Sequence, residues 1–252
     1  CGEYGEGKMS SPRQIFSFLD NYFNKKNIIK KRSLKALVTA GPTREFIDPI
    51  RYISNESSGK QGYEIADALN RLGIETTLIT GPSSIVSNKD IKTKKIVTAS
   101  EMFEAVKKSL PVDIAVCAAA VADLKPVYKS KSKLKKDNLR LKSFELQKNI
   151  DILEFLGKNN KHRPKIVIGF AAETENLDKN ALSKLKQKNC DIIIANDVSK
   201  KDSGFNSDYN RVSIIDNSGK IKVVKKNKKS FIANIIADII LDKILINDRS
   251  FN

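Results

Sequence analysis

Apolar positions along this chain alternate between two patterns. Continuous apolar runs, of the kind buried on both faces of a parallel sheet, predict strands at 34–39, 74–80, 91–97, 112–120, 165–170 and 191–195. Apolar residues spaced three or four apart predict helices at 12–23, 59–72, 100–110, 151–156, 176–188 and 230–246. Strands and helices that alternate in this way predict an α/β fold with a doubly wound, mostly parallel sheet.

Two segments depart from the alternation. Residues 211–216 and 220–224 flank Asn217-Ser218-Gly219 and predict a C-terminal hairpin. Residues 124–144 are polar, rich in lysine and without clear periodicity up to a short expected strand at 141–146. Such a basic segment suits either a flap that closes over a polyphosphate or a solvated loop.

The chain is strongly basic, with 46 Lys and Arg against 29 Asp and Glu and a net charge of +17. A balance of this size raises the question of nucleic-acid or membrane binding. The lysines are, however, spread through the chain, and no zinc-finger spacing or aromatic interleaving accompanies them. We therefore expect a solvated basic surface that helps to gather anionic substrates, with no nucleic acid and no membrane as partner.

Cysteine and histidine usage argues against a zinc site. The three cysteines, Cys1, Cys117 and Cys190, lie far apart, and His162 is the single histidine, in an expected surface turn. This pattern fits a reducing compartment, and we expect a cytoplasmic protein without a signal peptide. No uninterrupted apolar run reaches about 18 residues, so we expect no membrane span.

The stretch 38–62 carries the strongest candidate chemistry. It joins the first strand of the sheet to a helix, and free amide groups at a helix start attract anions. Gly59 and Gly62 allow the backbone to approach a ligand, and Ser57 and Ser58 are candidate helix caps. A P-loop is absent because Gln61 follows Gly59-Lys60, and a Gly-x-Gly-x-x-Gly turn is absent because Pro42 and Thr43 follow Gly41. A structural connector remains the alternative.

Other candidates follow later strands, at the carboxyl edge where ligands bind in open α/β sheets. Alanines 118–120 leave room for a flat base or a slender arm of a substrate, or pack under a helix. Asp123 suits a metal, a ribose hydroxyl or a turn, and Phe170 suits base stacking or the core. Ser100 and Thr174 are the expected caps of two helices.

Five ordered motifs resemble one family. TAGPTRE (39–45), DPIRYISNESSGK (48–60), AAAVAD (118–123), GFAAET (169–174) and ANDVS (195–199) are similar to successive signatures of phosphopantothenoylcysteine synthetase, the phosphopantothenate–cysteine ligase of bacterial coenzyme A synthesis. The resemblance runs from about residue 34 to about residue 212 and implies a Rossmann-like sheet. Lys133-Leu-Lys-Lys136 resembles the family flap, whereas Ile150 replaces a usual proline.

The resemblance implies a reaction. The carboxylate of 4'-phosphopantothenate attacks CTP to give an acyl-cytidylate and pyrophosphate, and L-cysteine then displaces CMP to form the amide. It implies Mg²⁺ to offset the triphosphate charge. It also implies a homodimer through this domain, in which pairing of the hairpin and flap regions is our expectation.

The resemblance also implies residue roles. Asn55 and Lys133 are the expected catalytic residues, and Asp123 is the candidate metal ligand. The expected substrate and nucleotide site consists of Arg51, Ser58, Gly59, Cys117, Ala118, Ala119, Ala120, Asp123, Ile150, Asp151, Ile152, Leu153, Phe170, Lys184 and Lys188.

The N-terminal segment resembles a different enzyme. Residues 1–24 resemble the end of the FMN-dependent phosphopantothenoylcysteine decarboxylase, which many bacteria fuse ahead of the synthetase, and Cys1 matches its catalytic cysteine. We expect a fragment in which residues 25–33 are a basic linker and 34–252 the ligase domain. We expect FMN, decarboxylation and a higher oligomer only with the missing half.

Two other functions remain open at this stage. A Rossmann-type NAD(P)-dependent reductase shares the strand order but needs the missing Gly-x-Gly-x-x-Gly turn. A non-catalytic nucleotide- or nucleic-acid-binding module would suit the charge, and would bind generic nucleic acid with steep salt dependence.

Overall fold

A mixed eight-stranded sheet forms the centre of the computed structural model, which describes residues 9–135, 143–158, 161–173, 177–197 and 207–249. The spatial order of its strands is β12-β11-β10-β9-β6-β1-β4-β5. Their bounds are β1 (Lys35–Ala40), β4 (Glu75–Thr80), β5 (Lys92–Lys95), β6 (Ile114–Cys117), β9 (Ile166–Glu173), β10 (Ile192–Asp197), β11 (Tyr209–Asp216) and β12 (Ile221–Lys228).

The six neighbouring strands β10, β9, β6, β1, β4 and β5 pair in parallel, and β11 and β12 add an antiparallel hairpin at one edge. The chain starts in the middle of the sheet at β1, moves outward through β4 and β5, and returns to β6 on the other side of β1. This reversal is the topological switch point of a doubly wound sheet. The predicted fold class and the C-terminal hairpin are confirmed.

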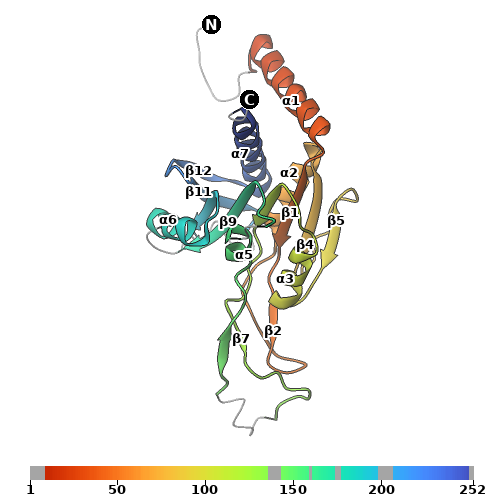
Figure 1. Cartoon of the computed structure of the whole chain (residues 1–252), viewed down its shortest axis with the longest axis vertical. Helices are drawn as coiled ribbons and strands as arrows, with labels where there is room; N and C mark the ends of the chain where they lie inside the picture. The colour runs from red at the N-terminus through yellow and green to blue at the C-terminus, as the bar shows by residue number, and fades with distance from the viewer. Residues whose placement is uncertain (1–8, 136–142, 159–160, 174–176, 198–206, 250–252) are drawn as a thin grey trace.

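Helices cover both faces of the sheet (Figure 1). Alternate strand residues, such as Val38 and Val116, pack against α2 (Lys60–Arg71) and α7 (Lys229–Arg249). Their sequence neighbours, such as Leu37 and Ala115, pack against the opposite layer. That layer consists of α3 (Ala99–Lys107), α5 (Ile152–Lys158) and α6 (Leu177–Lys188). Burial on both faces explains why these strands are continuous apolar runs.

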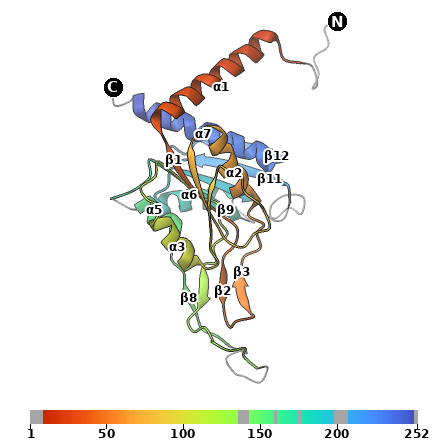
Figure 2. The ribbon, with the colours of Figure 1, turned by 90° about the vertical axis from the view of Figure 1, so that its right-hand side faces the viewer.

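An arm extends from the sheet at the end opposite α1 (Pro12–Arg32), as two perpendicular views show (Figure 2). It contains two antiparallel ribbons that the sequence did not predict. One pairs β2 (Arg44–Phe46) with β3 (Tyr52–Ser54), inside the stretch expected as a polar loop. The other pairs β7 (Leu124–Pro126) with β8 (Leu146–Lys148), at the base of the expected flap.

Several predicted boundaries were wrong. The first helix continues to Arg32, so the segment expected as a linker is largely helical. Strand β6 ends at Cys117, although Ala120 still forms an isolated parallel bridge with Pro42, and β8 begins at Leu146. Thr98, not Ser100, caps α3 by accepting a hydrogen bond from the Glu101 amide. The expected cap Thr174 lies outside the described residues.

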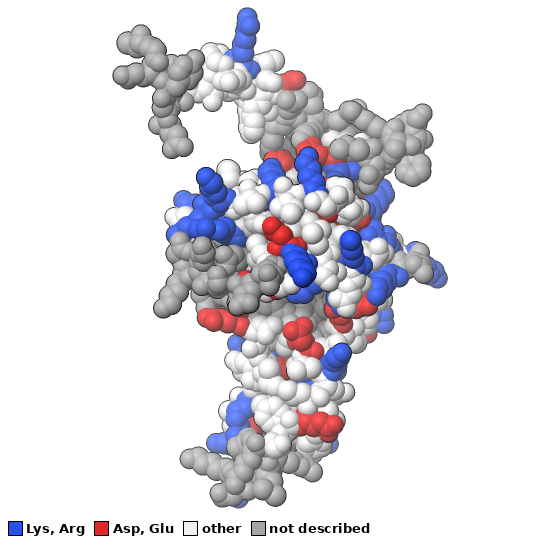
Figure 3. Space-filling view, turned by 90° about the vertical axis from the view of Figure 1, so that its left-hand side faces the viewer, with Lys and Arg blue, Asp and Glu red and all other residues white. Residues whose placement is uncertain are grey.

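Lysines mark both outer strands of the sheet. They are Lys92, Lys94 and Lys95 on β5, and Lys222, Lys225, Lys226 and Lys228 on β12. On the face drawn in Figure 3, basic side chains are spread out and interspersed with acidic ones. Among the helices of the described residues, none is long and apolar enough to cross a bilayer.

Candidate functional site

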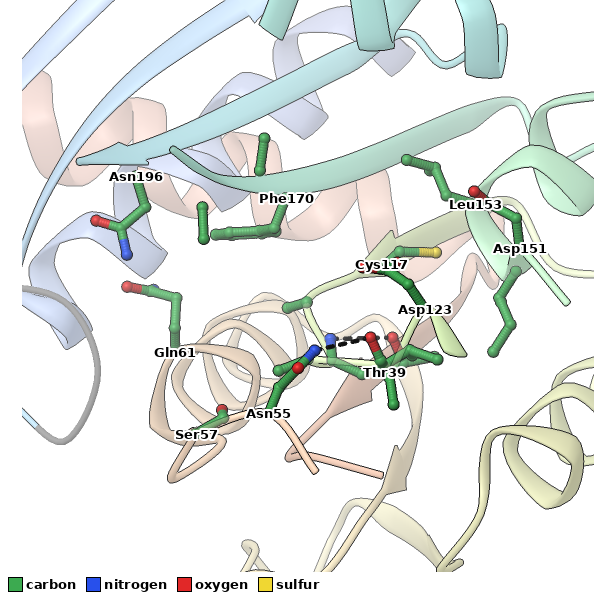
Figure 4. A pocket seen from close by; sticks show the side chains of 18 of the residues that line it. Thr39, Asn55, Ser57, Gln61, Cys117, Asp123, Asp151, Leu153, Phe170 and Asn196 are labelled. Atoms are coloured by element: carbon green, nitrogen blue, oxygen red, sulfur yellow. Dashed lines mark hydrogen bonds between the residues drawn. The ribbon is translucent and has the colours of Figure 1, made fainter. Parts of the chain in front are cut away.

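A cavity of about 1040 Å³ opens at the switch point, beyond the carboxyl ends of β1 and β6. Thr39, the next-to-last residue of β1, and Cys117, the last residue of β6, both line it, as does Phe170 from β9 (Figure 4). The start of α2 and the segment between β8 and α5 complete its walls. Fold and sequence motifs therefore meet at one place, where ligands of doubly wound sheets bind.

Most of the predicted site residues share this cavity. Its lining includes Asn55, Ser58, Gly59, Cys117, Ala118, Ala119, Ala120, Asp123, Ile150, Asp151, Ile152, Leu153, Phe170, Lys184 and Lys188. Arg51 and Lys133 are not among the lining residues, and Cys1 lies outside the described residues. Phe170 is half-buried and packs against the core, as one of the two expectations had it, and stacking on a base stays a prediction.

The start of α2 approaches the end of β1 through two glycines. Gly59 is the N-cap, with φ of 81°, and a Cβ there would lie 2.9 Å from the Gly41 nitrogen. At Gly62, a Cβ would lie 2.6 Å from the Cβ of Ala40. The serine caps were a wrong prediction, because Gly59 takes the cap position with no side-chain hydrogen bond. Ser57 Oγ instead accepts from the Gly59 amide at 3.1 Å.

The segment after β6 is held mainly through its backbone. The Ala119 amide donates to Thr39 Oγ1 at 3.3 Å, and the Ala120 amide donates to the Gly41 carbonyl at 2.9 Å. Both amide N–H groups are therefore used within the protein and hold the loop in place. Asn55 Nδ2 donates to the Val121 carbonyl at 2.9 Å, which fixes its side chain against the same loop (Figure 4).

Two asparagines of the lining were missed by the sequence reading. Asn149 Nδ2 donates to the Ala122 carbonyl at 2.8 Å, but the Oδ1 atoms of Asn149 and Asn196 are buried without a partner among the described residues. A buried carbonyl oxygen without a partner is costly, so a ligand that donates hydrogen bonds would be favoured here. Asn196 lies in the quoted motif ANDVS and Asn149 directly precedes Ile150, but neither was assigned a role, because a single amide has no distinctive spacing.

The two lysines of α6 are engaged by carboxylates. Lys188 Nζ lies 2.9 Å from both Asp151 Oδ2 and Glu154 Oε2, and Lys184 Nζ lies 3.1 Å from Glu173 Oε1. Burial lowers the pKa of Lys188, but its hydrogen bonds with these two acids outweigh burial and raise it. Hydrogen bonds from Lys158 and then Lys188 lower the pKa of Glu154 to about 2.

Arg51 joins the β2–β3 ribbon to the flap. Its Nε and Nη2 donate to Asp48 Oδ2 at 3.0 and 2.6 Å, and Nη2 also donates to the Leu134 carbonyl at 2.6 Å. The Leu134 amide returns a hydrogen bond to Asp48 at 3.2 Å. We call this set the Asp48–Arg51–Leu134 latch. It fixes the residue next to Lys133, whose own side chain is exposed.

Cys117 lines the cavity, but its thiol is poorly suited to act as a nucleophile. Burial, with a smaller effect from Asp151, raises the pKa of Cys117 above its ordinary value. The thiol therefore stays protonated at neutral pH, and thiolate is the reactive form.

Among the described residues, no three His, Cys, Asp or Glu side chains group as a metal site. Asp123 is exposed and lines the cavity. One carboxylate suits Mg²⁺, which commonly binds one or two carboxylates together with substrate phosphates.

Comparison with known proteins decides the family. The model of the DNA/pantothenate metabolism flavoprotein C-terminal domain matches residues 31–244. The chain belongs to this family.

Two curated relatives of this DNA/pantothenate metabolism flavoprotein C-terminal domain are the coenzyme A biosynthesis bifunctional proteins CoaBC of Haemophilus influenzae and Escherichia coli K12. The first is 40% identical over 241 residues, which are 95% of this chain and 59% of the relative. The second is 39% identical over 249 residues, which are 96% of this chain and 60% of the relative. The chain thus spans about three fifths of the curated relatives it matches.

A solved structure of the same family, the C-terminal domain of the bifunctional protein CoaBC, superposes with a TM-score of 0.70. It is 35% identical and covers 85% of this chain and 96% of its own. The central sheet is therefore that of the CoaBC C-terminal domain.

Proposed function

We propose that this chain is a phosphopantothenate–cysteine ligase that uses CTP. The observation that supports it best is the convergence of four separate motifs on one cavity. Residues 55–60, 117–123, 150–154 and 170–172 all line it, although they lie far apart in the sequence. The relatives named above act in coenzyme A biosynthesis by their names, and the family match extends that context to this chain.

The reaction proceeds in two balanced steps. A carboxylate oxygen of 4'-phosphopantothenate forms a bond to the α-phosphorus of CTP, and the bond to the β-phosphate breaks to release pyrophosphate. The cysteine nitrogen then forms a bond to the acyl carbon of the cytidylate. The acyl–oxygen bond breaks, CMP leaves, and the nitrogen gives up a proton to water.

Asn55 fits the acyl group because its anchored amide keeps one N–H and its oxygen available for a ligand. Groups fixed before reaction stabilise developing charge without reorganisation. Phe170 would stack on the base, and the amide oxygens of Asn149 and Asn196 would accept from the nucleoside.

Asp123 would hold Mg²⁺, which when bound offsets the charge of the triphosphate. Lys133 would neutralise phosphates from the flap, next to the latch at Leu134. Because Lys184 and Lys188 are engaged by carboxylates, we propose that they shape the wall of the site.

The test is direct. The chain is incubated with 4'-phosphopantothenate, L-cysteine and one nucleotide at a time, and products are detected by mass. We expect phosphopantothenoylcysteine, CMP and pyrophosphate in equal amounts with CTP. NADPH oxidation without CMP would instead support the reductase, and salt-dependent binding of generic DNA without any turnover would support the binding module.

The two relatives named above are longer than this chain, which covers 59% and 60% of them. We propose that residues 1–24 belong to a decarboxylase half, with FMN bound there, and that the fused protein forms a larger assembly than the homodimer of the ligase domain. Cytoplasmic location is part of the same proposal.

A further inference from the structure

Two helices begin with a lysine at one end of the cavity. Lys60 is the first residue of α2, Lys229 is the first residue of α7, and both line the cavity. The side chains of Gln61 and Asn196 lie on this side, away from Asp151 and Leu153 (Figure 4). Lys229 is only 5% exposed, and a lysine is rarely buried to this extent unless other groups pair with it.

The two helix starts are tied together. Gln61 Nε2 donates to the Lys229 carbonyl at 3.2 Å, and Asn210 Nδ2 donates to Gln61 Oε1 at 3.5 Å. Lys60 pairs with Asp208, whose carbonyl also accepts from the Lys229 amide at 2.9 Å. Backbone and amide contacts therefore hold the start of α7 against α2, whereas the Lys60 side chain is held by its ion pair with Asp208.

The electrostatics of this end differ from those near α6. There, Lys184 and Lys188 are matched by three carboxylates. Here burial lowers the pKa of Lys229, the nearby charge of Lys60 lowers it further, and Asp208 opposes both. The positive ends of two helix dipoles add to the same field. An anion placed here would relieve the repulsion between the two lysines.

We propose that Lys60 and Lys229 form a phosphate-binding subsite of the cavity. This proposal rests on the ligase function and locates one phosphate of its substrates. Both CTP, through its terminal phosphates, and 4'-phosphopantothenate present the same phosphoryl chemistry. A helix start with a lysine recognises that chemistry through amides and a point charge.

The test compares Lys229→Gln with Lys228→Gln, which removes the same charge one residue away from an exposed side chain that does not line the cavity. Binding of CTP, CMP, pyrophosphate, 4'-phosphopantothenate and pantothenate is measured by calorimetry. We expect Lys229→Gln to weaken a phosphorylated ligand by about tenfold or more, as the loss of one charge-assisted hydrogen bond implies. Lys228→Gln should leave every affinity unchanged.

The ligand series identifies the source of the phosphate. If the variant binds CTP and pyrophosphate more weakly but CMP with unchanged affinity, the subsite belongs to the nucleotide. If it binds 4'-phosphopantothenate more weakly but pantothenate with unchanged affinity, the subsite belongs to the acid. Lys229→Arg should keep the affinity, and equal melting temperatures exclude a folding defect. Unchanged binding of all phosphorylated ligands in Lys229→Gln overturns the subsite. An inactive wild-type chain that still shows the Lys229 effect would overturn only the ligase function.

Discussion

Asn55 shows how a single amide both belongs to the scaffold and remains available to a substrate. One hydrogen of Nδ2 is used on the Val121 carbonyl, in a loop that the Ala119 and Ala120 amides already hold. The side chain therefore sits in one place before any ligand arrives. Such pre-organisation is what transition-state stabilisation requires.

Replacing Asn55 by Ala should leave the fold intact and lower turnover by more than about tenfold, the equivalent of ~1.4 kcal/mol of transition-state stabilisation. Steady-state release of pyrophosphate and CMP measures the effect. Asn88→Ala is the matched control, since Asn88 bonds Asp67 outside the cavity. Turnover equal to that of the wild type would remove Asn55 from the mechanism.

The raised pKa of Cys117 should make its thiol slow to react in the folded protein. Because burial keeps the thiol protonated, native protein treated with iodoacetamide at neutral pH should stay unmodified at Cys117. The same residue should react readily once urea unfolds the chain. Mass spectrometry of the peptides gives the result, and rapid labelling of the native protein would contradict the assignment.

Sequence patterns predicted the residues that lie in motifs and missed those that do not. Asn55, Asp123 and Phe170 follow strands or belong to the quoted signatures, and all three line the cavity. Lys229 lies in no quoted motif, and only the packing of α7 beside α2 brings it to the cavity. Arg51 was expected in the site, but Asp48 holds it in the arm.

At the scale of elements, the start of α2 depends on contact between two backbones. Gly59 must adopt a left-handed conformation and must also pass close to Gly41. The sequence indicated glycine for close approach at this turn, but not that its partner would be the chain at the end of β1. That contact joins residues from different elements, which periodicity does not show.

We predict that Gly59→Ala destabilises the protein by more than Gly73→Ala. Both glycines have positive φ, so each alanine costs about 1–2 kcal/mol for the left-handed conformation. Only at Gly59 would the new Cβ also meet backbone, since nothing lies within 4 Å at Gly73. Urea unfolding of the two variants measures the difference. An equal loss of unfolding free energy in the two variants would mean that α2 moves to accept the new Cβ without cost.

The Asp48–Arg51–Leu134 latch links two ribbons of the arm. Burial raises the pKa of Asp48, but hydrogen bonds from Ile50, Arg51 and Leu134 outweigh burial and hold it below its ordinary value. The folded pKa is thus depressed. The contribution of Asp48 to stability is present above its unfolded pKa of about 3.9 and is lost as the pH falls through the lower folded value.

Arg51→Lys should open the latch at neutral pH, because lysine cannot reproduce the two-pronged hydrogen bond to Asp48. We expect the Leu134 amide to exchange hydrogen about tenfold faster, as loss of a charge-assisted hydrogen bond implies. Arg44→Lys is the control, since Arg44 lies over the Tyr52 ring in the same ribbon. Equal Leu134 exchange in Arg51→Lys and wild type would show that the flap is held by other contacts.

For the whole molecule, the sheet was predictable and the arm was not. Buried parallel strands give long apolar runs, so the order of strands and helices predicted the doubly wound topology. The ribbons of the arm have three-residue strands with mixed burial, which resemble loops in a sequence. Large apolar side chains remain exposed there, including Ile50 at 59% and Val127 at 48%.

We propose that the dimer contact includes the arm, because these apolar side chains are exposed there. We expect sedimentation equilibrium to give twice the chain mass of 28.1 kDa. Ile50→Lys combined with Val127→Lys should shift the protein toward the monomer, because a buried charge opposes association. Val86→Lys is the control, a residue 91% exposed outside the arm. A monomeric wild type would contradict the dimer.

The lysines on β5 and β12 bear on how the chain avoids fibrous self-assembly. The last strand on either side of a sheet offers open backbone groups to any strand that comes near, including one from another copy. Docking two such borders would force rows of ammonium groups together, and their mutual repulsion would oppose the addition of each new chain. Part of the net charge of +17 thus opposes the addition of strands from other copies to the sheet, besides attracting anions.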